Sequence, residues 1–217
     1  RAGAGGDRPV LRGSHGKQRR HLQKLSRDHV IHEMTSRHEA VVTIAPGERL
    51  SVETEDCFGG KVPSDAARFS PVACHRETPA TGPIDIANAG PGQILRVDIE
   101  QITVRDYAVM YIESGSGALG HRVDRSEATV MPIRESRVYM REHLAVLARP
   151  TVGLIGTAPL GKPQPTDVPG EHGGSLGCKE IGPGASVYLP IAVPGARLAV
   201  GDLHAIVGDG DVCICGA

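Results

Sequence analysis

The chain has 217 residues and a formal net charge of −1, from 24 Lys and Arg against 25 Asp and Glu. That length allows one large domain or two small ones with a hydrophobic core. The balanced charge gives no global attraction for nucleic acid or an anionic membrane, and no apolar stretch approaches the roughly 20 residues of a membrane-spanning helix, so we expect neither partner.

The amino-terminal residues 1–25 predict a disordered basic tail. This segment has an excess of Lys and Arg, almost no hydrophobic residues and no apolar stretch of the kind found in a secretory signal. A basic tail could also contact nucleic acid or serve as a transit segment. Residues 18–26 could form a short polar helix that leads into the first strand.

The rest of the chain predicts short strands separated by turns. It is rich in Gly (28) and Pro (16) and has only 3% aromatic residues, which favours strands joined by turns over a helix bundle. Residues 40–44 and 50–56 flank a turn at 45–48 and predict a hairpin with one buried face. Further strands are expected at residues 94–104, 108–112, 129–133, 152–155, 187–193, 198–200, 205–207 and 212–215.

These elements predict a mainly β fold. We expect residues 26–150 to form a β-sandwich, and residues 151–217 to form an additional β-rich or α+β portion. The number of cysteines is odd and their spacing resembles no zinc knuckle, which predicts reduced thiols and a cytoplasmic location. The cysteines are Cys57, Cys74, Cys178, Cys213 and Cys215.

The densest cluster of chemically active residues is at 201–211. Asp202 and His204 are two residues apart, so an extended chain places both side chains on one side, and the same holds for Asp209 and Asp211. Carboxylate and imidazole groups suit zinc or another divalent ion. Judged by spacing alone, two Asp-Gly turns beside a hydrogen-bonded histidine are the more common explanation.

Two further clusters are candidates. In the first, Glu171 could act as acid or base and His172 as a metal ligand, while the N–H groups of Gly173 and Gly174 could bind an oxyanion. The alternative for this segment is a mobile Gly-rich surface loop. In the second, the carboxylates of residues 53–56 could bind a metal or form a solvated strand edge.

Taken in order, these clusters resemble the acetamidase/formamidase family of amide hydrolases, from about residue 28 to residue 215. No single motif is decisive, and the resemblance rests on the ordered set. The matching segments are V-E-T-E-D-C-F at 52–58, P-A-T-G-P-I at 79–84, A-G-P-G at 89–92, G-L-I-G-T-A-P at 153–159, P-G-E-H-G-G at 169–174, Y-L-P at 188–190, G-D-L-H-A at 201–205 and G-D-G-D at 208–211.

The resemblance implies hydrolysis of formamide- or acetamide-like substrates to a carboxylate and ammonia, usually by a homo-oligomer. It also implies a divalent metal, zinc in the first place and calcium as the alternative, which would activate the attacking water. Glu171 is the candidate general base, with Gly173 and Gly174 beside the oxyanion. The implied metal ligands are Asp56, His172, Asp202, His204 and Asp211.

The chain departs from the family pattern at several positions. Ser175 and Gly177 stand where the family has Asn and Asp, Asp211 replaces Glu, and family members generally continue beyond Cys215. These differences motivate a rival hypothesis, a catalytically impaired member that acts as a binding or assembly subunit. A second rival is a metal-free hydrolase that uses a carboxylate pair or Cys178 as its nucleophile.

Overall fold

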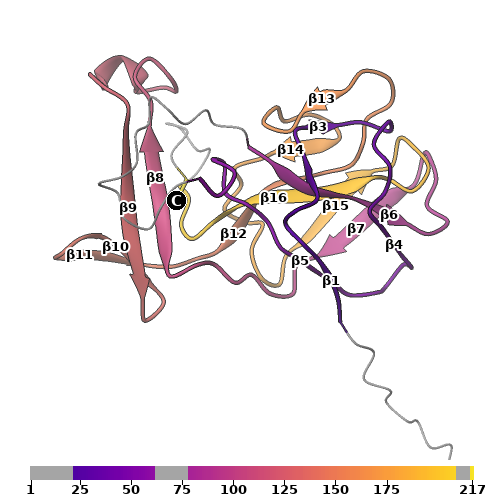
Figure 1. Ribbon diagram of the computed structural model, residues 1–217, viewed down its shortest axis with the longest axis horizontal. Coiled ribbons are helices and arrows are strands. Elements are labelled where there is room, and N and C mark those ends of the chain that lie inside the picture. Colours follow the sequence, from indigo (N-terminus) through magenta and orange to yellow (C-terminus); the bar gives the residue numbers. More distant parts are fainter. Residues whose placement is uncertain (1–21, 62–77, 209–215) are drawn as a thin grey trace, which may run out of the picture.

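The computed structural model describes residues 22–61, 78–208 and 216–217, which fold almost entirely into β-strands (Figure 1). The helical element of this part of the chain is a single 3-10 turn, Gly120–Arg122. Within the described ranges no helix is long and apolar enough to cross a membrane. The predicted mainly β fold is confirmed.

The central sheet has six strands in the order β14-β12-β16-β6-β2, with β4 pairing on β6. Every residue of β12 is buried, and so are nearly all residues of β6, as expected for strands covered on both faces. Strands from both sides of residue 150 share this sheet, so the expected division there is not visible in the sheet topology. The strands are β2 (Val30–Ile31), β4 (Val42–Ile44), β6 (Ala80–Ile86), β12 (Thr151–Gly156), β14 (Gly173–Ser175) and β16 (Leu198–His204).

A separate four-stranded antiparallel sheet stands at the left in Figure 1, in the order β11-β10-β9-β8. Its buried residues Met131 and Val138 pack in one cluster with Ala205 and Ala217, so this sheet meets the chain just beyond the end of β16. Its strands are β8 (Tyr107–Ile112), β9 (Glu127–Arg134), β10 (Arg137–Arg141) and β11 (Leu144–Leu147).

Three strand pairs complete the fold. The main core cluster joins Ile84, Ile155 and Leu198 of the central sheet to Leu25 and Leu189 of two of these pairs. The pairs are β1 (Gln23–Leu25) parallel to β5 (Leu50–Val52), β3 (Glu33–Met34) with β13 (Gln164–Pro165), and β7 (Ile94–Asp98) with β15 (Ser186–Pro190).

Two local predictions are wrong. The expected hairpin around residues 45–48 has its turn, where the Glu48 N–H donates to the Ala45 carbonyl at 3.1 Å, but its two strands do not pair. Instead β4 runs parallel to β6 and β5 parallel to β1, because each buries its apolar residues against a distant strand. Residues 23–25 of the expected polar helix form β1, since they pair with β5.

The sequence predicted the positions of most later strands correctly, but it predicted their ends less accurately. Residues 152–155 lie within β12 and residues 108–112 within β8, whereas the long run expected at 94–104 is a strand only as far as Asp98. The strand expected at 198–200 lies within β16, which ends at His204, whereas the strand expected at 205–207 is not formed. The predictions for residues 1–21 and 212–215 lie outside the described residues.

Candidate functional site

Asp202 and His204 lie at the end of β16, and both side chains are buried, at 7% and 8% exposure. His204 Nε2 lies 3.6 Å from Asp202 Oδ2, which is longer than a hydrogen bond between these groups. Asp202 has a φ of +49°, an uncommon conformation for a residue other than glycine. Such strain is held in place by surrounding packing and is concentrated at functional sites.

Two glycines make room for the His204 ring. A Cβ atom on Gly153 would lie 2.6 Å from His204 Cε1, and one on Gly216 would lie 2.5 Å from both Cδ2 and Nε2. Gly216 is fixed beside the ring because Ala217 and Ile206 exchange two backbone hydrogen bonds of 2.8 and 2.9 Å. Side chains at either glycine would therefore displace the imidazole.

Asp202 and His204 line a large open cleft, with a volume of about 1480 Å³, that Asp56 also lines. Strands β4, β5, β7 and β16 and the first residues of β8 form its walls. Much of the lining is aliphatic and belongs to the partly buried margin of the main core. The cleft thus combines a buried polar pair with an apolar wall, the usual composition of a small-molecule site.

Asp56 is held in a turn of its own backbone. Its Oδ1 accepts hydrogen bonds from the N–H groups of Phe58 and Gly60 at 2.9 and 3.0 Å. Its Oδ2 lies 4.0 Å from Nη1 of Arg105. The local turn therefore uses one carboxylate oxygen, and among the described residues the other has a single, distant cation.

A short chain of contacts connects the Asp56 segment to the Asp202 segment. The Thr78 N–H donates to the Cys57 carbonyl at 3.1 Å, and Thr78 leads directly into β6. The first residue of β6, Ala80, pairs with Gly201, the residue before Asp202. The two acidic segments are therefore held to one another by β6.

The other acidic residues of the 53–56 segment are paired with cations. Lys24 Nζ lies 2.6 Å from Glu53, and Glu55 bridges Arg27 and Arg105 at 3.5 and 3.1 Å. The hydrogen bond from Lys24 holds the pKa of the Glu53 carboxyl below its usual value. Asp56 is consequently the least neutralised carboxylate of the 53–56 segment.

The Glu171–Gly174 cluster lies elsewhere. Glu171 is exposed, and His172 is buried, with its Nε2 without a hydrogen-bond partner among the described residues. Burial lowers the pKa of His172 below its ordinary value. None of the four residues lines the cleft, and Ser175 and Gly177 do not line it either.

The two glycines of this cluster have structural roles. Gly173 and Gly174 have φ values of +98° and +95°, and a Cβ on Gly173 would collide with the Ile155 carbonyl. The Gly173 N–H donates to the Gly170 carbonyl at 3.0 Å. Gly174 pairs with Ile155, and the pairs on either side of it are joined by the Thr157–His172 and Leu176–Gly153 backbone hydrogen bonds. By the alternation of an antiparallel ladder, the Gly174 N–H donates to β12. Both N–H groups are thus engaged in backbone hydrogen bonds, and an oxyanion role for them stays a prediction.

His172 cannot share an ion with His204 within one chain. Strand β12 has Thr151 opposite His204, and the Thr157 N–H, six residues along, donates to the His172 carbonyl at 2.9 Å. Six residues of strand span about 20 Å at roughly 3.3 Å per residue. Of the expected metal ligands, the structure brings together Asp202 and His204, places Asp56 in the same cleft and places His172 apart, while Asp211 lies outside the described residues.

The distance between Asp202 Oδ2 and His204 Nε2 is compatible with both atoms binding one metal ion. Ligand atoms about 2.0–2.2 Å from a zinc ion can lie up to roughly 4.2 Å apart, and the 3.6 Å between Nε2 and Oδ2 is within that limit. Within the described ranges, no group of three or more His, Cys, Asp and Glu side chains could hold a metal. A metal site here therefore needs further ligands.

Sequence reasoning missed the residues that surround this pair. Gly153 belongs to one of the motifs, but nothing in the sequence indicates that it lies against His204. Gly216 and Arg105 carry no signal at all, because their positions depend on which distant strands pair.

Comparison with known proteins gives a consistent result. The model of the Acetamidase/Formamidase family matches residues 26–166 and 133–217. The formamidase of Methylophilus methylotrophus is 24% identical over 237 residues, which cover 82% of this chain and 58% of that protein. The chain thus spans less than two thirds of the length of this relative.

Solved structures agree with that match. The acetamidase of Bacillus halodurans superposes with a TM-score of 0.86 at 37% identity, over 89% of this chain and 66% of its own. A predicted acetamidase/formamidase from Thermoanaerobacter tengcongensis also gives 0.86, at 36% identity, over 90% and 65% of the two chains. A gamma lactamase from Delftia acidovorans, at 23% identity and a TM-score of 0.76, shares the fold.

Proposed function

Because the chain belongs to the acetamidase/formamidase family, we propose that it hydrolyses a short linear carboxamide to a carboxylate and ammonia at the Asp202–His204 end of the cleft. The observation that carries this proposal is the buried carboxylate–imidazole pair, 3.6 Å apart and facing the cleft. A formamide- or acetamide-like substrate suits the aliphatic wall, which can cover a small alkyl group. A cytoplasmic location and a homo-oligomeric state remain predictions.

Asp202 Oδ2 and His204 Nε2 are the atoms that would hold the divalent ion, with Asp211 as a predicted further ligand. Imidazole nitrogen with carboxylate oxygen favours zinc over calcium, which prefers oxygen ligands alone. When bound, such an ion lowers the pKa of a water molecule and makes it nucleophilic at neutral pH. Burial of the pair keeps its orientation fixed while a substrate binds.

We assign the transfer of protons to Asp56. The two N–H groups at its Oδ1 fix the carboxylate, and Oδ2 is left to accept the proton of the attacking water and to return it to the departing ammonia. Glu171 was the base expected from the sequence, but its side chain is exposed and does not line the cleft.

The positions of Ser175 and Gly177 favour an active enzyme over the impaired family member. Both residues depart from the family pattern, yet neither lines the cleft. Gly177 has a φ of +52°, so the backbone here suits a glycine. Neither departure from the family pattern therefore removes a group from the cleft that the Asp202–His204 pair lines.

The test is ammonia release from formamide and acetamide by His204→Gln and Asp202→Asn variants. Both substitutions keep the approximate size of the side chain, and Asn tolerates the positive φ at residue 202. We expect both variants to stay folded and to lose turnover. His143→Gln, at an exposed histidine outside the cleft lining, is the matched control and should retain turnover. Turnover unchanged in His204→Gln would overturn the proposal.

A further inference from the structure

We propose that two buried hydroxyl groups, those of Thr81 and Thr166, position the Asp56 carboxylate in the cleft by fixing the two ends of the segment that carries it. Both threonines are 1% exposed and neither lines the cleft, so they act through Asp56 and not on a substrate. The importance of this role for catalysis rests on the proposed function, but the role itself does not. Neither threonine was among the candidate residues from the sequence.

Thr81 fixes the first end of this segment. Its Oγ1 donates a hydrogen bond to the Glu53 carbonyl at 2.8 Å. Thr81 lies on β6, and its partner on β16 is Val200, two residues before Asp202. The hydroxyl of Thr81 therefore joins the start of the acidic segment to the central sheet, close to Asp202.

Thr78 fixes the second end, next to Asp56. The Thr78 N–H donates to the Cys57 carbonyl at 3.1 Å. Thr78 is 1% exposed and has a φ of +40°, which is an outlier for a β-branched residue. Such a conformation persists only where the surrounding structure holds it. A contact that holds Thr78 in place therefore also holds the Cys57 end of the segment.

Thr166 supplies that contact. Its Oγ1 donates to the Thr78 carbonyl at 2.7 Å in a buried environment. The His32 carbonyl is farther from Oγ1, at 3.2 Å, and already accepts the Thr166 N–H at 3.1 Å. The hydroxyl proton is thus directed to Thr78. Thr166 lies between β12 and β14, as Glu171 does, so this part of the chain contributes to the cleft without lining it.

The two threonines do what the turn around Asp56 cannot do alone. The N–H groups of Phe58 and Gly60 orient the Asp56 carboxylate only relative to its own turn. The bonds at Glu53 and Cys57 fix that turn relative to the central sheet, which carries the Asp202–His204 pair. A misplacement of about 1 Å in a reacting group can lower a rate about 100-fold. Loss of either hydroxyl should therefore impair proton transfer by Asp56.

The experiment compares Thr81→Val and Thr166→Val, which remove the hydroxyl and keep the shape, with Thr81→Ser and Thr166→Ser, which keep the hydroxyl. Thr157→Val is the matched control. Thr157 is 0% exposed, does not line the cleft, and its Oγ1 donates to the Pro190 carbonyl at 2.8 Å. The control therefore loses a comparable buried hydrogen bond elsewhere in the molecule.

Two readouts separate the position of Asp56 from turnover. The first is the amide nitrogen-15 signal of Phe58, whose N–H donates to Asp56 Oδ1. The chain has 2 Phe residues, so selective phenylalanine labelling leaves two amide signals, and Phe69→Leu identifies the one from Phe58. The second readout is the kcat and KM for acetamide, measured with the original Asp56 and again in an Asp56→Asn background.

We expect both Val variants to shift the Phe58 signal and to lower kcat by about 10- to 100-fold with little change in KM. In the Asp56→Asn background the same substitutions should lower kcat no further, because they act through Asp56. The Ser variants and Thr157→Val should resemble the unmodified protein in both readouts. Where a Val variant does not fold, the Ala variant at the same position replaces it.

An unchanged Phe58 signal in the folded Thr81 and Thr166 variants would overturn the positioning role, whether or not the protein hydrolyses amides. An equal fall in kcat with and without the Asp56 carboxylate would overturn it as well, because the threonines would then act on the fold in general. A shifted Phe58 signal in a protein without amide turnover would support the positioning role and refute only the proposed function.

Discussion

At the scale of single residues, the site depends on small side chains as much as on reactive ones. We expect Gly153→Ala to destabilise the protein by about 1–3 kcal/mol, because its methyl group would lie 2.6 Å from His204 Cε1 and 2.5 Å from the Asp202 carbonyl. Turnover should be lost as well. Urea unfolding and ammonia release measure the two effects. Gly90→Ala, where a Cβ meets nothing within 4 Å, is the control, and equal losses in both variants would contradict the account.

Asp56 offers a test that separates proton transfer from metal binding. Asp56→Asn retains an oxygen for the Phe58 and Gly60 N–H groups, so the local turn should persist. We expect kcat to fall by about 100-fold or more while zinc affinity changes little, as for loss of a general base. If zinc affinity falls together with kcat, Asp56 is instead a metal ligand.

His172 should make stability depend on pH. Its pKa is lowered by burial, so the unfolded chain binds a proton more readily than the folded protein does. The contribution of neutral His172 to the free energy of unfolding is therefore complete above the ordinary histidine pKa of about 6.5. It decreases as the pH falls from there toward the lower pKa of His172 in the folded protein. Urea unfolding between pH 7.5 and 5.5 should show this decrease, and His172→Gln should reduce it. An equal decrease in both proteins would count against this assignment.

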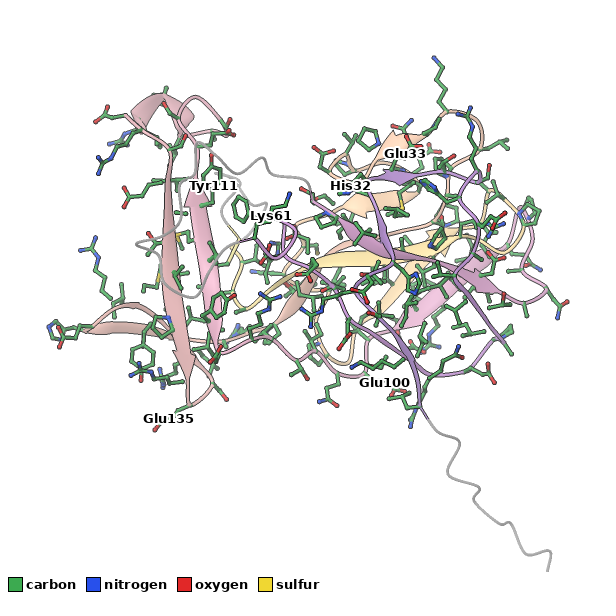
Figure 2. All side chains as sticks on the ribbon, viewed as in Figure 1. His32, Glu33, Lys61, Glu100, Tyr111 and Glu135 are labelled. Atoms are coloured by element: carbon green, nitrogen blue, oxygen red, sulfur yellow. The ribbon has the colours of Figure 1, made fainter. Side chains whose placement is uncertain are left out.

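At the scale of elements, the hairpin between β9 and β10 carries an unfavourable turn. Glu135 and Ser136 have φ values of +50° and +58°, in a two-residue turn that favours Asn-Gly. Glu135 lies at the tip of the hairpin (Figure 2). The double variant Glu135→Asn/Ser136→Gly should stabilise the protein by about 1–2 kcal/mol in urea unfolding, since left-handed backbone costs other residues more. No gain would show that the turn is not strained.

Strand positions were predictable from the sequence, but strand partners were not. The apolar runs that form β8 and β12 are long enough to predict strands from the sequence alone. The turn at residues 45–48 follows from its Pro-Gly sequence. The parallel partners of β4 and β5 are distant in the sequence, so no local pattern could reveal them. The turn was therefore predicted correctly, but the pairing of its two flanking strands into a hairpin was not.

At the scale of the whole molecule, the same limit decides which site residues could be foreseen. Asp202 and His204 are two apart on one strand, so local periodicity alone placed them on one side. The relation of His172 to this pair depends on how β14 and β16 align along β12, and that alignment separates them by about 20 Å. The position of Gly153 beside His204 became visible for the same reason, through the register of β12 with β16.

The arrangement of the sheets explains why the pair lies in a cleft. Beyond His204 the chain packs against the four-stranded sheet through Ala205 and Ala217, while β16 itself belongs to the central sheet. The pair is therefore located where the two sheets meet (Figure 1). Side chains from both parts, including Arg105 and Val109, contribute to the cleft lining.

The most direct test of the central claim is ammonia release from formamide, acetamide and propionamide, measured before metal is stripped, after stripping, and after zinc is restored. We predict that turnover disappears on stripping, returns with zinc, and is absent from Asp202→Asn under every condition. Turnover that is indifferent to chelation would contradict the metal-dependent mechanism, and no turnover from folded protein on any of these amides would contradict the proposed activity itself.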